Sequence, residues 1–122
     1  MTQRILMAED DRDIQLVAGL ALRKAGYDVT IVGSGRELLE RVAEVKPDII
    51  LLDWMMPELD GPATLERLRE GEATSRIPVI FLTAKSQRVE VHRGLELGAA
   101  GYIIKPFDVL TLGQQVRALL AT

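Results

Sequence analysis

The sequence has 122 residues, 48% of them hydrophobic, no cysteine, and a formal net charge of -3 at pH 7. This length corresponds to one compact domain, so we expect a single domain over residues 1–122. The missing cysteines exclude disulfides and thiolate metal sites, and they are typical of a cytoplasmic protein. Apolar runs stay well short of the roughly 20 residues that span a bilayer, and the charges are interspersed, so the composition favours neither a membrane nor direct nucleic-acid binding.

Apolar runs of strand length recur along the chain at residues 5–8, 29–32, 49–52, 79–82 and 102–104. Stretches with helical spacing of apolar residues lie between them. Residues suited to begin these helices as N-caps are Asp11, Ser34, Asp60, Ser86 and Asp108, and residues suited to end them are Gly26, Gly71 and Gly98. The alternation predicts an α/β fold, a flavodoxin-like doubly wound sheet of five parallel strands in the order 2-1-3-4-5 with five helices on both faces.

The residues at the ends of the strands lie at the edge where such sheets bind ligands, and most of them are polar. They are Glu9, Asp10 and Asp11 after the first strand, Asp53 after the third, Thr83 and Ala84 after the fourth, and Lys105 and Pro106 after the fifth. The first and third strands are neighbours in the predicted order, so their acids should converge. Carboxylates gathered without histidine or cysteine favour Mg²⁺, or Mn²⁺, as the bound cation. The alternative is that Asp11 only caps the first helix and Glu9 faces solvent.

Lys105 and Thr83 add a cation and a hydroxyl beside this acidic cluster. A carboxylate with a metal on one side and these two groups on the other is suited to attack phosphorus and to hold phosphoryl oxygens. Each residue also has a simpler interpretation. Thr83 is a β-branched residue of the kind that strands prefer, and Lys105 can be a solvated strand end.

Four segments together resemble the receiver domain of bacterial two-component response regulators, including the single-domain chemotaxis regulators. They are ILMAEDD at 5–11, DIILLDWMMPELDG at 48–61, IPVIFLTAK at 77–85 and GAAGYIIKPF at 98–107. The resemblance covers essentially the whole chain. It implies a signalling switch that is phosphorylated on aspartate and does not turn over an external substrate.

The resemblance also implies a role for each site residue. Asp53 would be the phosphoacceptor, which accepts the phosphoryl group from a phosphohistidine. The Mg²⁺ ligands would be Asp10 directly, Glu9 mainly through water, Asp53, and the backbone carbonyl of Met55. Thr83 and Lys105 would contact the phosphoryl group, and a cis bond before Pro106 would aim the lysine.

Tyr102 takes the position of the family's switch aromatic. In that scheme Thr83 moves toward the phosphoryl group, Tyr102 turns into the vacated space beside the small Ala84, and the surface of the fourth helix, fifth strand and fifth helix changes. The alternative is that Tyr102 is simply a half-buried aromatic of a strand.

Two positions that tune loss of the phosphoryl group in the family are Met55 and Lys85, each two residues beyond a site residue. Methionine cannot orient an attacking water and a lysine stem can cover the site, so we expect slow self-dephosphorylation. Glu9 stands where many members have aspartate, which keeps the charge. The position of the only histidine, His92, on the predicted fourth helix indicates a surface residue.

Members that dimerise to bind DNA often carry charged residues where this chain has Ala100, Gly101, Thr111 and Gln115. We therefore expect a monomer or a weak dimer. The expected partners are a histidine kinase or phosphotransfer protein, and a downstream protein or an output domain outside this sequence. Two alternative functions are a phosphatase, which would need a second acid at Met55, and an interaction module of the same fold that works without phosphorylation.

Overall fold

The computed structural model describes residues 2–84, 92, 96–105 and 109–120. The strands are β1 (Arg4–Ala8), β2 (Asp28–Val32), β3 (Ile49–Asp53), β4 (Val79–Ala84) and β5 (Gly101–Lys105). The helices are α1 (Arg12–Lys24), α2 (Gly35–Val45), α3 (Gly61–Glu70) and α5 (Leu112–Leu120). All five strands pair in parallel in the order β2-β1-β3-β4-β5, so the predicted topology is confirmed.

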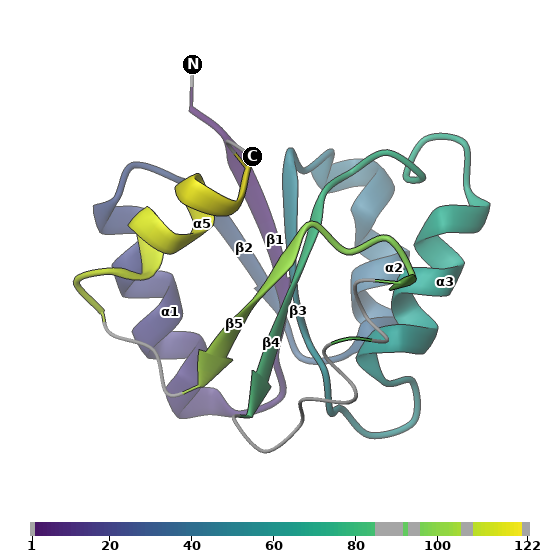
Figure 1. The fold of residues 1–122 in the computed structure, drawn as a ribbon, viewed down its shortest axis with the longest axis horizontal. Coiled ribbons are helices and arrows are strands. Elements are labelled where there is room, and N and C mark those ends of the chain that lie inside the picture. Colours follow the sequence, from purple (N-terminus) through teal and green to yellow (C-terminus); the bar gives the residue numbers. More distant parts are fainter. Residues whose placement is uncertain (1, 85–91, 93–95, 106–108, 121–122) are drawn as a thin grey trace.

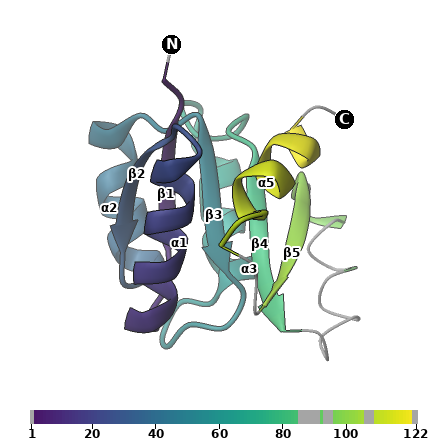
Figure 2. The same ribbon diagram turned by 90° about the vertical axis from the view of Figure 1, so that its left-hand side faces the viewer.

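Helices cover both faces of the sheet. Figure 1 shows α1 and α5 on one side and α2 and α3 on the other, and in the turned view of Figure 2 α1 and α5 lie in front of the sheet. The helix predicted between β4 and β5, with Ser86 as its N-cap, falls mostly outside the described residues. Among the described residues of this region, His92 Nε2 lies 3.1 Å from Glu96 Oε1. The His92 side chain is 78% exposed, as predicted for a surface residue.

The central strands are buried on both faces because side chains alternate between the two helix layers. In β1, Ile5 and Met7 join the apolar cluster under α1 and α5, whereas Leu6 and Ala8 join the cluster under α2 and α3. Every residue of β3 is buried. The continuous apolar runs in the sequence therefore reflect two cores, one on each side of a single sheet.

Side-chain caps fix where three of the helices begin. Asp11 accepts hydrogen bonds from the backbone N–H groups of Asp13 and Ile14, and Ser34 and Asp60 cap α2 and α3 in the same way. These three N-caps are confirmed, and Asp108 lies outside the described residues. None of the helices in the described part of the chain is long and apolar enough to cross a membrane.

The helix α5 packs closely on α1 through a glycine. A β-carbon built on Gly113 would lie 2.5 Å from the β-carbon of Ala25, which is too close for two carbon atoms. Glycine therefore allows α5 to approach α1 and to bury Leu112 and Val116 against the sheet.

Candidate functional site

Glu9, Asp53 and Lys105 reach one edge of the sheet on the same face. Residues 5 and 7 of β1, 49 and 51 of β3, and 103 of β5 all point into the cluster under α1 and α5. Since side chains alternate along a strand, residues 9, 53 and 105 continue these rows on that face. The strand register thus places two carboxylates and one ammonium at the carboxyl ends of β1, β3 and β5, with β4 between β3 and β5.

Lys105 bridges the two buried carboxylates. Its Nζ lies 2.9 Å from Asp53 Oδ1 and 2.9 Å from Glu9 Oε1. The Asp53 side chain is only 6% exposed and that of Glu9 1%, while Lys105 keeps 19% of its side-chain surface exposed. The interpretation of Lys105 as a solvated strand end is therefore wrong. Its ammonium group forms ion pairs with both carboxylates of the site.

Glu9 is held by three contacts at the end of β1. Its Oε2 accepts a hydrogen bond from Asp11 N–H at 3.0 Å, its Oε1 pairs with Lys105, and its backbone N–H donates to Val32 O at 3.0 Å. Asp11 does cap α1, but Glu9 is completely buried and does not face solvent. One half of the alternative interpretation of this turn is thus confirmed and the other half is wrong.

Three carboxyl groups at this edge lie close enough to share a cation. Glu9, Asp10 and Asp53 each offer one oxygen, and these oxygens lie within 4.8 Å of one another. Asp10 is exposed, whereas Glu9 and Asp53 are buried. An all-oxygen donor set with one solvent-facing carboxylate fits Mg²⁺, an ion that usually keeps several waters.

Burial raises the pKa of Asp53 from 3.8 to about 7. The hydrogen bond from Lys105 opposes this rise, and the negative charge of Glu9 adds to it. For Lys105, burial alone would lower the pKa, but the hydrogen bonds to Glu9 and Asp53 and the negative charges of these two groups together raise it. Three carboxylates around one ammonium leave two excess negative charges when all three are ionised, and a bound divalent cation would compensate them.

In protein free of divalent cations, we expect stability to fall as the pH rises toward about 7. The unfolded Asp53 carboxyl ionises near 3.8 and the folded one near 7, so the folded state holds a proton that the unfolded state releases. Between about pH 5 and about pH 9 this effect lowers the free energy of unfolding by about 2 to 3 kcal/mol. Urea unfolding followed by tryptophan fluorescence measures it.

The Asp53→Asn variant is the control, because its amide does not titrate while all other ionisable groups remain. Its free energy of unfolding should lack this pH-dependent loss. Parallel curves for the wild-type protein and Asp53→Asn would mean that Asp53 has an ordinary pKa.

The segment after Asp53 packs tightly beneath the site. Trp54 is buried and meets Phe81 of β4 edge-on, with ring centroids 4.7 Å apart. Gly61 N–H donates to Trp54 O at 2.9 Å, and a β-carbon on Gly61 would lie 2.7 Å from Asp53 O. Glycine at the start of α3 thus lets the chain return against the end of β3 and fixes the residue that follows Asp53.

Some of the other predicted site residues lie within the described residues and others do not. Thr83 is buried at the end of β4, the Tyr102 side chain is 40% exposed on β5, and Met55 is 64% exposed beside Asp53. Lys85 and Pro106, and with Pro106 the predicted cis bond, lie outside the described residues. The roles of Thr83, Tyr102 and the Met55 carbonyl stay predictions.

The sequence interpretation did not identify Gln15. Its side-chain amide donates to the backbone carbonyl of Glu9 at 2.6 Å, so it contacts the turn that carries the acids. The residue pattern does not single out Gln15, and only its place in the sequence is consistent with this contact. With Asp11 as N-cap, Gln15 lies in the first turns of α1, where a polar side chain can reach back to the end of the preceding strand.

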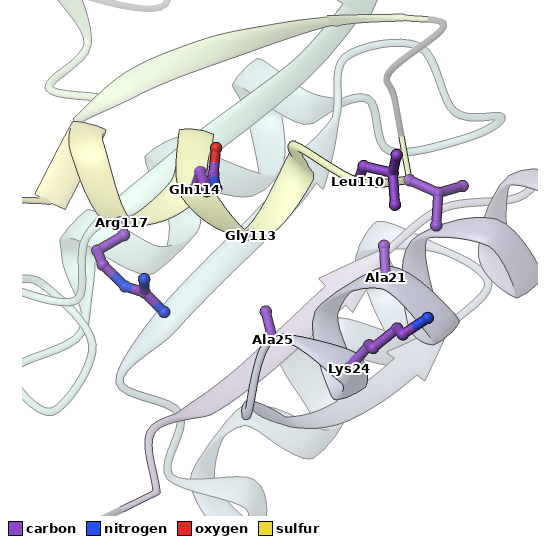
Figure 3. A pocket seen from close by; sticks show the side chains of 8 residues that line it. Ala21, Lys24, Ala25, Leu110, Gly113, Gln114 and Arg117 are labelled. Carbon is purple, nitrogen blue, oxygen red and sulfur yellow. The ribbon is translucent and has the colours of Figure 1, made fainter.

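A hollow lies between α1 and α5. Figure 3 shows Lys24, Ala25, Gly113, Gln114 and Arg117 around it, and its volume is about 320 Å³. Two cations, small residues and Leu110 line it, with no carboxylate or hydroxyl among the lining residues. None of the residues of the acidic cluster lines this hollow.

Comparison with known proteins gives one consistent result. The sequence profile of the response regulator receiver domain matches residues 5–117. The DNA-binding response regulator MtrA of Mycolicibacterium paratuberculosis is 42% identical over 120 residues, which are 98% of this chain and 52% of MtrA. The chain thus spans about half the length of the curated relatives it matches.

Solved structures agree along almost the whole chain. The chemotaxis protein CheY4 of Vibrio cholerae superposes with a TM-score of 0.90 at 26% identity, covering 98% of this chain and 99% of CheY4. The signal receiver domain of a signal transduction histidine kinase from Syntrophus aciditrophicus gives a TM-score of 0.86 at 35% identity. The superposition covers 98% of this chain and 91% of that domain.

Proposed function

The chain belongs to the response regulator receiver domains, and from this premise we propose that Asp53 is its phosphoacceptor. Receiver domains are signalling domains that work as phosphorylation-dependent switches. The observation that carries the proposal is the position of Lys105 between the two buried carboxylates of Glu9 and Asp53. Asp53 is the one of the two at the end of the central strand β3, where a phosphoryl donor can approach the exposed Asp10 side of the cluster.

The proposed reaction moves a phosphoryl group from a phosphohistidine to Asp53. A carboxylate oxygen of Asp53 bonds to phosphorus while the phosphorus–nitrogen bond breaks, and the imidazole leaves with the bonding electrons and takes up a proton. The Lys105 ammonium, already 2.9 Å from Asp53 Oδ1, neutralises charge on the transferred oxygens. Thr83, buried at the end of β4, would donate its hydroxyl to the same group.

The acidic cluster supports Mg²⁺, or Mn²⁺, as the cofactor of this reaction. Asp10, Glu9, Asp53 and the Met55 carbonyl would hold the ion. When bound, it would neutralise negative charge on the phosphoryl oxygens. Its two positive charges would also compensate the negative charge of Glu9, which adds to the effect of burial in raising the pKa of Asp53.

The proposed switch uses Thr83 and Tyr102. Thr83 is buried while the Tyr102 side chain is 40% exposed, an arrangement that leaves the ring free to turn inward when Thr83 moves. The change would alter the surface formed by β5 and α5. A partner that prefers one arrangement then binds phosphorylated and unphosphorylated protein with different affinity.

We propose one receiver domain over residues 1–122, working in the cytoplasm with a histidine kinase or phosphotransfer protein. Its output would pass through a downstream protein or an attached output domain, without direct contact between this domain and nucleic acid, as a monomer or weak dimer. A receiver fold that works without phosphorylation is less favoured, since the Lys105 bridge and the acidic cluster are both present. Phosphatase turnover is less favoured because Met55 offers no acid to the leaving group.

Acetyl phosphate tests this function without the natural kinase. With Mg²⁺ present, intact-mass spectrometry should show the addition of one phosphoryl group, because a small phosphodonor replaces the phosphohistidine. Chelation of divalent cations with EDTA should prevent it. Equal labelling with and without EDTA would contradict the metal-dependent reaction, and no labelling with Mg²⁺ would contradict the phosphoacceptor.

Met55→Asn should shorten the lifetime of the phosphorylated protein by about tenfold or more. The exposed Met55 side chain cannot orient a water molecule, whereas an asparagine amide beside Asp53 can hold one for attack on phosphorus. Decay of the phosphorylated mass after removal of the donor measures the lifetime. Met55→Leu is the matched control and should leave it unchanged; an unchanged lifetime in Met55→Asn would show that Met55 is not the brake.

A further inference from the structure

The turn between β1 and α1 carries the acids of the site, and one side chain from α1 holds its backbone. Gln15 Nε2 donates to the carbonyl oxygen of Glu9 at 2.6 Å. Gln15 is itself fixed at the start of α1, where its backbone N–H donates to Asp11 O at 3.0 Å. The amide therefore closes the turn from the helix back to the end of the strand.

The Glu9 carbonyl needs this donor because the β-ladder ends at that point. Glu9 N–H still donates to Val32 O, but Val32 is the last residue of β2. The backbone carbonyl of Glu9 therefore has no hydrogen-bond partner within the ladder. A buried carbonyl without a donor costs free energy. The Gln15 amide supplies the hydrogen bond to the Glu9 carbonyl that a continuing β2 strand would otherwise supply.

The same carbonyl belongs to the peptide bond between Glu9 and Asp10. Both oxygens of the Glu9 carboxylate are already bound, one by Lys105 and one by Asp11 N–H. With the Gln15 bond, the plane of this peptide is fixed as well. That plane also contains the nitrogen and the α-carbon of Asp10, so it fixes the point from which the exposed Asp10 side chain extends.

We propose that Gln15 is a positioning residue for the divalent cation, which orients Asp10 and Glu9 through the carbonyl of Glu9. This inference rests on the proposed Mg²⁺ site and adds a residue outside the acidic cluster to it. Residues that orient metal ligands in this way commonly contribute 10- to 100-fold, as an order of magnitude, to metal affinity. Because one turn of backbone separates Gln15 from the ion, we expect about a tenfold effect.

Gln15→Met and Gln15→Ala test the proposal together. Both remove the donor, but methionine keeps most of the side-chain volume and alanine does not. Mg²⁺ titrations of the full chain, followed by Trp54 fluorescence or calorimetry, should give a dissociation constant raised about tenfold in both variants. Gln115→Met, an exposed glutamine of α5, is the matched control and should bind Mg²⁺ like the wild-type protein.

Each outcome decides a different claim. Wild-type affinity in Gln15→Met, with or without a loss in Gln15→Ala, overturns the positioning role, because only packing would then matter. Urea unfolding in EDTA measures the loss of stability separately from the loss of Mg²⁺ affinity. A variant that is destabilised but still folded gives its own Mg²⁺ affinity in the titration. Failure of the wild-type protein to bind Mg²⁺ would instead contradict the proposed metal site itself.

Discussion

Asp53→Asn should abolish phosphorylation by acetyl phosphate, reducing the rate below detection. The amide nitrogen and oxygen are poor nucleophiles toward phosphorus, while the shape of the side chain and the packing around it are kept. The buried Glu9 carboxylate is already bound by Lys105 and Asp11 N–H, so it is not available to replace Asp53. Intact-mass spectrometry after incubation with donor and Mg²⁺ measures the loss.

A matched control is Asp48→Asn, which changes an acid at the opposite end of β3. Asp48 immediately precedes β3, whereas Asp53 is its last residue, and Asp48 accepts a hydrogen bond from Arg4 N–H. This variant should be phosphorylated like the wild-type protein. Undiminished labelling of Asp53→Asn would mean that another residue accepts the phosphoryl group and that the assignment of Asp53 is wrong.

Lys105→Met should slow phosphorylation at neutral pH by about 100-fold or more. Two effects act in the same direction. The variant loses the ammonium that lies 2.9 Å from Asp53 Oδ1, and it loses the hydrogen bond that lowers the pKa of Asp53. More Asp53 is then protonated at neutral pH, and a protonated carboxyl group is not a nucleophile. The rate with acetyl phosphate and Mg²⁺ measures the combined effect.

The dependence on pH separates these two effects. The part caused by protonation should recover as the pH is raised, whereas the part caused by the missing ammonium should remain. Lys24→Met, which removes an exposed lysine of α1, is the control for the loss of one positive charge and should behave like the wild-type protein. A rate in Lys105→Met close to that of the wild-type protein would contradict a direct role for the ammonium.

The sequence alone predicted most of the sheet, for a physical reason. Strands buried on both faces must be almost entirely apolar, so their runs and their polar ends stand out, as they do at Ile49–Asp53. The topology rule then brought Asp53 and the acids after β1 to one edge. The N-caps Asp11, Ser34 and Asp60 were visible because their side chains bond within a few residues.

Contacts between distant residues were harder to predict. The bond from Lys105 to Glu9 spans 96 positions and depends on strand register and on side-chain direction across β3 and β4. The Gln15 bond to a backbone carbonyl leaves no mark in the residue pattern, because any polar side chain at that position would look the same. Left-handed backbone at Lys46 and Glu58, where glycine or asparagine is usual, was equally invisible.

The central claim is that Mg²⁺-dependent occupation of Asp53 changes the structure around it. Trp54 reports on this directly, since it follows Asp53, is buried, and packs on Phe81 of the strand that carries Thr83. Beryllofluoride, which mimics a phosphoryl group on a carboxylate, should change Trp54 fluorescence when Mg²⁺ is present, and should change nothing in Asp53→Ala. No response in the wild-type protein, or an equal response in Asp53→Ala, would contradict the account.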